Sequence, residues 1–311
     1  MEKEKNFVSA VIYLHNAETI IGEFIHKISD VLSDNFHKFE IICVNDASTD
    51  NSVSVAKKSA EQYVDAPLTI IEMSEFHGVE LSMNAGVDLA IGDYVFEFDS
   101  PIMDFEKKLV MDVYRKTLEG YDIVSAVPDK QKDAGSGCFY RLFNRFSHSN
   151  YKMQTERFRI VSRRLINRVG AVNQTIPYRK VVYTNSGLAA EYLSYSPKNT
   201  ETLSKDKQDK TYRWNLALKS LILFTDLGYR FSIWMTAAMM LITLLVAVYA
   251  VVIFCTGSPV AGWTTTILFL SIAFFGLFGI LSIVIKYLDI LVNLSFVKQQ
   301  YRIKNIEKVN K

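Results

Sequence analysis

The chain has 311 residues, a net charge of +2 at pH 7 and three cysteines far apart. This length suits one large domain or two of ordinary size. The small net charge gives no whole-chain bias toward nucleic acid, and the absence of a CxxC pair argues against a disulfide framework and a structural zinc site. The first residues, MEKEK, carry no apolar segment, so we expect no signal peptide and a cytoplasmic N-terminal domain.

Short β-branched and aromatic runs alternate with segments of helical periodicity over the first 126 residues. The predicted strands are Val8–Leu14, Phe39–Asn45, Leu68–Met73, Tyr94–Phe98 and Asp122–Ala126. The predicted helices are Glu18–Leu32, Ser52–Tyr63, Val79–Ala90 and Phe105–Leu118. The weaker pattern that follows predicts helices at Gly135–Phe146 and Arg163–Val169, and strands at Phe158–Val161 and Leu193–Tyr195. The alternation indicates an α/β fold with a mostly parallel sheet and helices on both faces.

Asp99 stands at the end of the aromatic strand in GDYVFEFDSPIMD, and Ser100-Pro101 forces a turn after it. Ligands of open α/β sheets bind just beyond the carboxyl ends of the strands. A carboxylate at such an end can hold a divalent cation or the hydroxyls of a nucleotide. It can equally cap the following turn.

The C-terminal third has a different composition, because no charged residue occurs from Phe231 to Ile285. Segments 233–255 and 265–285 each reach the roughly 20 residues that span a bilayer. Lys and Arg flank this hairpin and are missing from its short loop, so both flanks are expected in the cytoplasm. The predicted organisation is a cytoplasmic domain over 1–198, a charged linker and interfacial amphipathic helix over 199–230, the transmembrane hairpin over 231–285, and a basic C-terminal helix or tail over 286–311.

Three stretches in this order resemble family 2 glycosyltransferases with the GT-A fold: VSAVIYLHNAETI, IICVNDASTDNS and GDYVFEFDSPIMDF. They are similar to the opening strand, the DDGSTD turn and the DxD strand of that family. FYRLFNRFS, RFRIVSRRLI and the hairpin narrow the resemblance to the polyprenyl-phosphate subgroup, which includes dolichol-phosphate mannose synthases and bactoprenol glucosyltransferases. The resemblance therefore implies a GT-A-type nucleotide-binding sheet carried on a membrane anchor.

Site residues follow from this resemblance. It implies that His15, Asn16, Glu18 and Asp46 lie near the nucleotide of the donor, and that Asp99 is the ligand of a diphosphate-bound Mg²⁺ or Mn²⁺. An Asx-turn role for Asp46, a helix-capping role for Glu18 and a solvated His15 remain open. Arg159 and Arg163 match arginines that suit phosphate, because guanidinium forks fit phosphate oxygens. Of Arg163 and its neighbour Arg164, one is expected to face water. Arg141 is a candidate for the acceptor phosphate or a plain surface residue.

The sequence departs from the family pattern at three carboxylates, which are replaced by Asn45, Pro101 and Arg157. Mg²⁺ is usually held by one or two carboxylates plus substrate phosphates, so Asp99 alone could suffice. Glu97 could help, or face a neighbouring strand or helix. A second hypothesis gives Arg157 part of the work of the metal, as a fixed cation near the diphosphate and thus a catalytic residue.

The prediction is a multi-pass inner-membrane, inverting glycosyltransferase with both termini in the cytoplasm. Its expected partners are a nucleotide sugar, a polyprenyl phosphate and the membrane, with no nucleic acid, and the resemblance allows a homo-oligomer. A phosphate acceptor is favoured because it needs no strong general base. One alternative is a transferase that extends a lipid-linked oligosaccharide, with Glu156 as the replacement base. The other is a catalytically degenerate scaffold that binds nucleotide or lipid.

Overall fold

The computed structural model describes residues 2–129, 140–141, 143–145, 153–172, 178–184, 186–198, 211–212, 214–216 and 301–310, together with scattered residues between 234 and 291. The chain divides into two compact units. The first comprises residues 1–145, 149–217 and 298–311, and the second comprises 146–148 and 218–297. The sheet and the candidate site both belong to the first unit.

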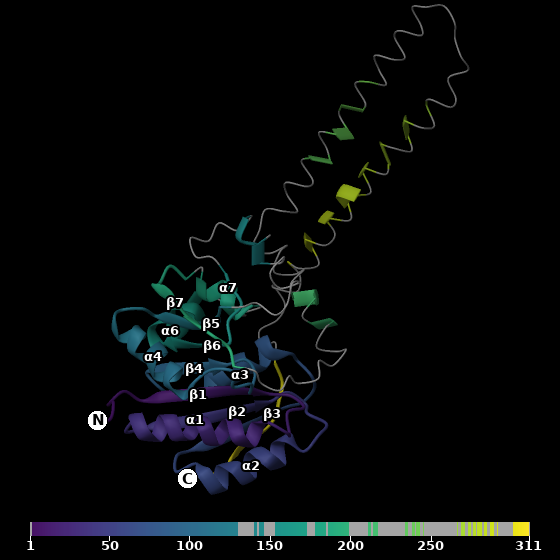
Figure 1. Cartoon of the computed structure of the whole chain (residues 1–311). Helices are drawn as coiled ribbons and strands as arrows, with labels where there is room; N and C mark the ends of the chain where they lie inside the picture. Colours follow the sequence, from purple (N-terminus) through teal and green to yellow (C-terminus); the bar gives the residue numbers. More distant parts are fainter. Residues whose placement is uncertain are drawn as a thin grey trace, which may run out of the picture. The chain divides into compact units, whose positions relative to one another are not determined.

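A mixed sheet forms the centre of the first unit (Figure 1). In chain order its strands are β1 (Val8–Leu14), β2 (Phe39–Asn45), β3 (Leu68–Met73), β4 (Tyr94–Phe98), β5 (Ile123–Pro128), β6 (Phe158–Ser162), β7 (Ala190–Tyr195) and β8 (Ile303–Lys308). Their order across the sheet is β7-β5-β6-β4-β1-β2-β3-β8. The strands β3, β2, β1 and β4 are parallel, whereas β6 runs antiparallel to both β4 and β5, and β8 runs antiparallel to β3. The carboxyl ends of β1, β2, β3 and β4 therefore meet at one edge.

Helices cover both faces of the sheet. They are α1 (Ile21–Asn35), α2 (Ser52–Tyr63), α3 (Val79–Leu89), α4 (Lys107–Leu118), α6 (Arg163–Val172) and α7 (Arg179–Thr184). Figure 1 shows α1 and α3 on opposite sides of the strands. Alternate side chains of β1 point to opposite faces of the sheet. Ala10 and Ile12 pack in the main apolar core with α1, whereas Val11 packs against α3. The α3 layer lies so close that a Cβ added to Gly86 would approach Val11 Cγ1 to 2.4 Å.

The α/β prediction is confirmed, and the expected strands β1, β2, β3 and β4 have the predicted bounds. The first helix begins at Ile21 rather than Glu18, and backbone amides of the preceding loop are bonded to side chains that follow β2. Ala17 N donates to Ser52 Oγ at 2.8 Å, and Glu18 N donates to Asp50 Oδ2 at 3.1 Å. The prediction of one mostly parallel sheet holds for its centre and not for β6 and β8.

Two described elements were not predicted, α7 and β8. The prediction of a C-terminal helix or tail over 286–311 is wrong for residues 303–308, which form a strand. Here β8 covers the edge of β3, and Ser74 N donates to Arg302 O at 2.9 Å. The first unit therefore contains residues from the far end of the chain, beyond the predicted boundary at residue 198.

Most of the predicted hairpin, 233–255 and 265–285, lies outside the described residues, as do 199–210 of the linker. The described residues between 234 and 291 are helical. A Cβ added to Gly276 would lie 2.6 Å from Met239 Sδ, and one added to Gly279 would lie 3.0 Å from Met235 Cε. The later glycine lies next to the earlier methionine, so the two helical stretches run antiparallel. Within the part of the chain described, no helix is long and apolar enough to cross a membrane.

Cys43 lies in the buried strand β2 and forms no disulfide. Burial raises the pKa of its thiol to about 12. It is therefore an unreactive core residue. Cys138 and Cys255 lie outside the described residues.

Candidate functional site

The loops that follow β1 and β2 are tied together at the carboxyl edge of the sheet. Asn16 has a left-handed backbone, with φ of 47°, and its Oδ1 accepts a hydrogen bond from Thr49 N at 2.9 Å. Glu18 Oε2 accepts one from Asn51 N at 2.9 Å. Asn tolerates this conformation because its short polar side chain can form local hydrogen bonds. Asn16 and Glu18 thus fix the shape of the loop pair.

Asp46 is buried at the end of β2, and its carboxylate holds the loop between β3 and α3. It accepts hydrogen bonds from His77 N at 2.8 Å, Gly78 N at 2.7 Å and Tyr13 Oη at 2.9 Å. His15 Nδ1 lies 2.6 Å from the Asp46 carbonyl oxygen. These bonds run to a loop 31 and 32 residues further along the chain, so they are not the Asx turn considered for Asp46, which bonds the backbone two residues on. A contact with the nucleotide stays a prediction.

Aromatic rings gather around this loop. The Phe76 ring lies 4.9 Å from that of His15 and 6.0 Å from that of Tyr212, centroid to centroid. Gly78 has φ of 81°, and a Cβ placed there would lie 2.2 Å from the Tyr212 ring. Tyr212 belongs to the segment predicted as the interfacial helix, and its ring reaches the loop that Asp46 holds. Flat apolar rings beside polar loops suit a heterocyclic base.

A buried ionic network lies on the α3 face, at the carboxyl end of β4. Glu97 and Arg159 are directly opposite each other in the antiparallel β4–β6 pair. Arg159 donates a hydrogen bond to Asp99, and its Nε lies 3.7 Å from Glu97 and 3.4 Å from Glu156. The Asp99 side chain is 28% exposed, whereas that of Arg159 is 3% exposed. Asp99 is therefore the member of this pair that reaches the surface.

The short helix α7 completes the network. Arg179 is fully buried, and its guanidinium contacts Glu80 at 3.2 Å, Glu97 at 3.1 Å and Asp99 at 2.6 Å. Next to it, Lys180 Nζ lies 3.3 Å from Glu156, and its charge lies 4.5 Å from the centroid of the Tyr140 ring.

Sequence reasoning missed Glu80, Arg179 and Lys180 as site residues. One signal was present: Glu97 sits inside an aromatic strand, and a buried carboxylate requires a cation.

Opposing effects set the ionisation of this network. Burial disfavours the charged form of Asp99, but Arg159 and Arg179 outweigh it and hold its pKa below the ordinary value. Burial raises the pKa of Glu80, and the opposing attraction of Arg179 is weaker. Asp99 is thus an ionised group, while Glu80 is the more easily protonated member.

The surroundings of Asp99 decide whether the expected Mg²⁺ or Mn²⁺ can bind there. Both Asp99 oxygens already accept from guanidinium groups, Oδ2 from Arg159 and Oδ1 from Arg179. A dication on the same oxygens would lie beside two fixed positive charges. The described ranges also hold no cluster of three or more His, Cys, Asp or Glu side chains that could bind a metal. The residues present do not fit a metal at this position.

Residues 9–173, just over half of the chain, match the family model Glycosyl transferase family 2. The chain belongs to this family. This glycosyltransferase is 24% identical over 313 residues to the bactoprenol glucosyl transferase of Shigella phage SfV, which covers 98% of this chain and 99% of that protein. It is also 24% identical to the uncharacterized glycosyltransferase YkcC of Bacillus subtilis, over 60% of this chain, and the match spans 59% of YkcC.

Its fold is shared with the mannosyltransferase PcManGT from Pyrobaculum calidifontis, solved in complex with GDP-Man and Mn²⁺. The TM-score is 0.50 at 18% identity, over 70% of this chain and 63% of that one. The likeness at this identity concerns the fold alone.

Within the described residues, Asp99 forms no ion pair with the other predicted arginines of the glycosyltransferase. Arg157 makes a two-pronged pair with Asp104, Nε–Oδ1 2.9 Å and Nη2–Oδ2 2.5 Å. The guanidiniums that meet Asp99 are those of Arg159 and Arg179. The cationic role assigned to Arg157 is therefore better filled by these two residues.

Arg163 lies at the opposite end of β4 from Asp99, because β6 runs antiparallel to β4. Its guanidinium donates to Ala90 O at 2.8 Å and to Gly92 O at 2.7 Å. The structure thus corrects the prediction that groups Arg163 with Arg159 at the phosphates. Arg164 is the neighbour that faces water, with its side chain 68% exposed. Arg141 is exposed on a helical stretch, as a plain surface residue would be.

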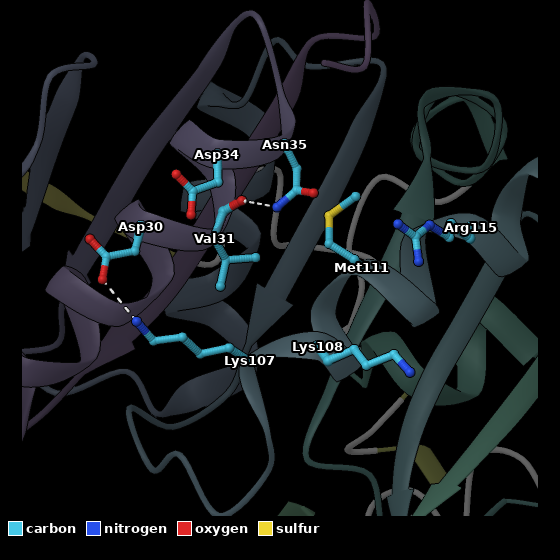
Figure 2. A pocket seen from close by; sticks show the side chains of 8 residues that line it. All are labelled: Asp30, Val31, Asp34, Asn35, Lys107, Lys108, Met111 and Arg115. Atoms are coloured by element: carbon cyan, nitrogen blue, oxygen red, sulfur yellow. Dashed lines mark hydrogen bonds and ion pairs between the residues drawn. The ribbon is translucent and has the colours of Figure 1, made fainter. Parts of the chain in front are cut away.

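A separate groove lies between α1 and α4 and shares no residue with the ionic network. Figure 2 shows Lys107 reaching across it to Asp30, with Nζ 2.8 Å from Oδ2. Its floor comes from Val31 and Met111, and its rim carries both acids and bases. Mixed and paired charges on the face away from α3 give no reason to place the donor or the acceptor there.

Proposed function

We propose that this chain is a membrane-anchored inverting glycosyltransferase that moves a sugar from a nucleotide-diphosphate donor to a polyprenyl phosphate at the cytoplasmic face. The observation that carries the proposal is the shared edge of the sheet. The aromatic loops around Asp46 and the ionic network around Asp99 both lie at the carboxyl ends of parallel strands, where α/β folds bind nucleotides. Glu80, two residues after Gly78, links the two parts through Arg179.

The proposed transfer is a single displacement. An oxygen of the acceptor phosphate forms a bond to the anomeric carbon, and the bond from that carbon to the donor diphosphate breaks. The electron pair leaves with the nucleoside diphosphate, and the configuration inverts. A phosphate monoester has its second pKa near 6, so at pH 7 the acceptor needs no general base. The task of the protein is then to position both substrates and to stabilise charge on the leaving group.

Glu156 offers little support for the alternative acceptor, a sugar hydroxyl of a lipid-linked oligosaccharide. Its two carboxylate oxygens face Lys180 at 3.3 Å and Arg159 at 3.4 Å, and the side chain is 5% exposed. A carboxylate buried between two cations is poorly placed to take a proton from a hydroxyl. The name of the full-length phage relative also favours a lipid-phosphate acceptor.

Membrane anchoring is supported by the second unit. Large apolar side chains are exposed there, among them Trp234 at 77% and Leu245 at 60%. Exposed apolar side chains on antiparallel helical stretches suit contact with lipid. Alkaline washing of membranes from expressing cells tests this part: an integral protein stays in the pellet, and release into the wash would contradict the anchor.

The activity is tested with membranes that contain the full chain and a panel of radiolabelled nucleotide sugars, with and without added polyprenyl phosphate. Label in the organic phase that depends on the lipid and is released by mild acid supports the proposal. Acid-stable lipid label would support oligosaccharide extension instead. Tight nucleotide binding without any turnover across the panel would favour the non-catalytic scaffold.

A further inference from the structure

The guanidinium of Arg179 occupies the centre of a carboxylate cage. Its three nitrogens each face a different acid, Glu80, Glu97 or Asp99, at 3.2, 3.1 and 2.6 Å. The backbone N of Arg179 also donates to Glu80 Oε2 at 2.9 Å, and the side chain is 0% exposed. Backbone and side chain are thus both anchored, so this cation is a permanent part of the fold.

The charges of the cage are nearly balanced without any added ion. Glu80, Glu97 and Asp99 contribute three negative charges when ionised, and Arg159 and Arg179 contribute two positive ones. Lys180 and Glu156 pair with each other at 3.3 Å. Burial raises the pKa of Glu80, and a proton on it would bring the sum to zero. A cage close to neutrality exerts little attraction on a dication.

Arg159 has unused hydrogen-bonding capacity at the same place. Its Nη1 is buried and has no hydrogen-bond partner among the residues that the structure describes. An unpartnered buried donor is costly, and phosphate oxygens, like carboxylates, are strong acceptors for a guanidinium. Arg159 lies directly against Asp99, the member of the pair that reaches the surface.

We infer that Arg179 occupies the position that a divalent cation would need among Glu80, Glu97 and Asp99, and that this chain binds the donor diphosphate without a metal through Arg159. The inference rests on the proposed function, since it concerns the same donor. Arg159 neutralises the charge that develops on the departing diphosphate, while Arg179 fixes Asp99 and through it the Arg159 fork.

The test is the binding of UDP, GDP and dTDP, each alone, to the purified full chain by calorimetry, first in EDTA and then in Mn²⁺. We expect at least one nucleotide to bind in EDTA, with a Kd that Mn²⁺ changes by less than about tenfold. Tightening by more than about tenfold in Mn²⁺ would overturn the inference and leave the proposed transferase intact. Failure of all three to bind in either buffer would overturn both.

Two variants assign the binding to these arginines. Arg159→Gln should weaken binding in EDTA by about tenfold or more, because it removes a charged hydrogen bond to phosphate. The matched control Arg164→Gln, in α6 beyond the opposite end of β6 and with its side chain facing water, should leave it unchanged. Arg179→Met should lose binding in EDTA and regain it in Mn²⁺, a rescue that a merely structural arginine would not give. Should either arginine variant fail to fold, nucleotide binding by the wild-type chain in EDTA and in Mn²⁺ still decides whether the donor diphosphate is bound without a metal.

Discussion

Arg159, the second residue of β6, donates a hydrogen bond to Asp99, one residue beyond the end of β4. The pair exists because β6 runs antiparallel to β4 and sets Arg159 opposite Glu97, two residues before Asp99 on the same face. Asp99 thus holds the guanidinium that the proposed mechanism directs at the diphosphate.

Asp99→Asn should lower the transfer rate by about 10²-fold or more, because the amide neither balances nor orients the two guanidiniums. Rates from the radiolabel assay and a melting curve on the same preparation measure this. The control is Asp93→Asn, at the opposite end of β4, where Asp93 Oδ2 accepts from Phe7 N at 2.9 Å. Equal losses in both variants would mean that Asp99 acts through stability alone.

Gly78→Ala should destabilise the chain twice over. The positive φ of Gly78 costs a Cβ-bearing residue about 1–3 kcal/mol, and the new Cβ would overlap the Tyr212 ring. In a Tyr212→Ala background the overlap disappears and only the backbone term remains, so the double variant should recover part of the melting temperature.

Gly120→Ala is the matched control for the backbone term. Gly120 has φ of 105°, and nothing lies within 4 Å of a Cβ placed there. Its loss of stability should not depend on residue 212. If Tyr212→Ala leaves the cost of Gly78→Ala unchanged, Tyr212 does not pack on this loop in solution.

Stability should fall in acid partly through Asp122. Burial opposes its charge, but hydrogen bonds from Arg164 and from Ser162, the latter at 2.6 Å, outweigh burial and keep its pKa below the ordinary value. A lowered pKa stabilises the folded state above the unfolded value of about 3.9, and this gain is lost as the pH falls through the folded value.

Asp122→Asn should therefore be less stable than wild type at pH 7, and the gap should close below about pH 4. Urea unfolding across this range measures it. Asp112→Asn is the control. It removes a carboxylate of α4 whose ion pair with Arg115, at 3.8 Å, is long and solvent-exposed, so its stability should vary with pH as that of the wild type does. A gap that persists in acid would show that Asp122 acts through packing rather than charge.

Truncation before Tyr301 should loosen the loop around Asp46. It removes β8, the bond from Ser74 N to Arg302 O and the bond from Arg302 N to His77 Nε2, at 3.2 Å. Amide exchange at residues 74–78 should speed up, because that loop loses its bonds to residue 302 and keeps those to Asp46.

Asn310→Ala is the milder comparison for the same end of the chain. Asn310 Nδ2 donates to Ala60 O and Val64 O at the end of α2, at 2.9 and 2.8 Å. This variant should cost about 1 kcal/mol and leave exchange at 74–78 unchanged. Unchanged exchange in the truncated chain as well would show that β8 does not hold the loop around Asp46.

The sequence by itself determined most of the secondary structure, the protein family and the position of two candidate site residues at strand ends. Short β-branched and aromatic runs predicted β1 through β4, which are buried on both faces, and the helical spacing of apolar residues predicted most helices. The resemblance in three ordered motifs was enough for the family. It also placed Asp46 and Asp99 at strand ends, where the parallel topology brings them to one edge.

Only the tertiary structure decided the partners of the charged residues. Arg159 contacts Asp99, whereas Arg157 pairs with Asp104. Arg163 lies at the end of β4 opposite to Asp99. Arg179, the second partner of Asp99, comes from a helix 80 residues away in sequence. Strand direction and the return of distant segments set these pairings. They are long-range properties, and no local pattern encodes which buried carboxylate a given arginine will neutralise.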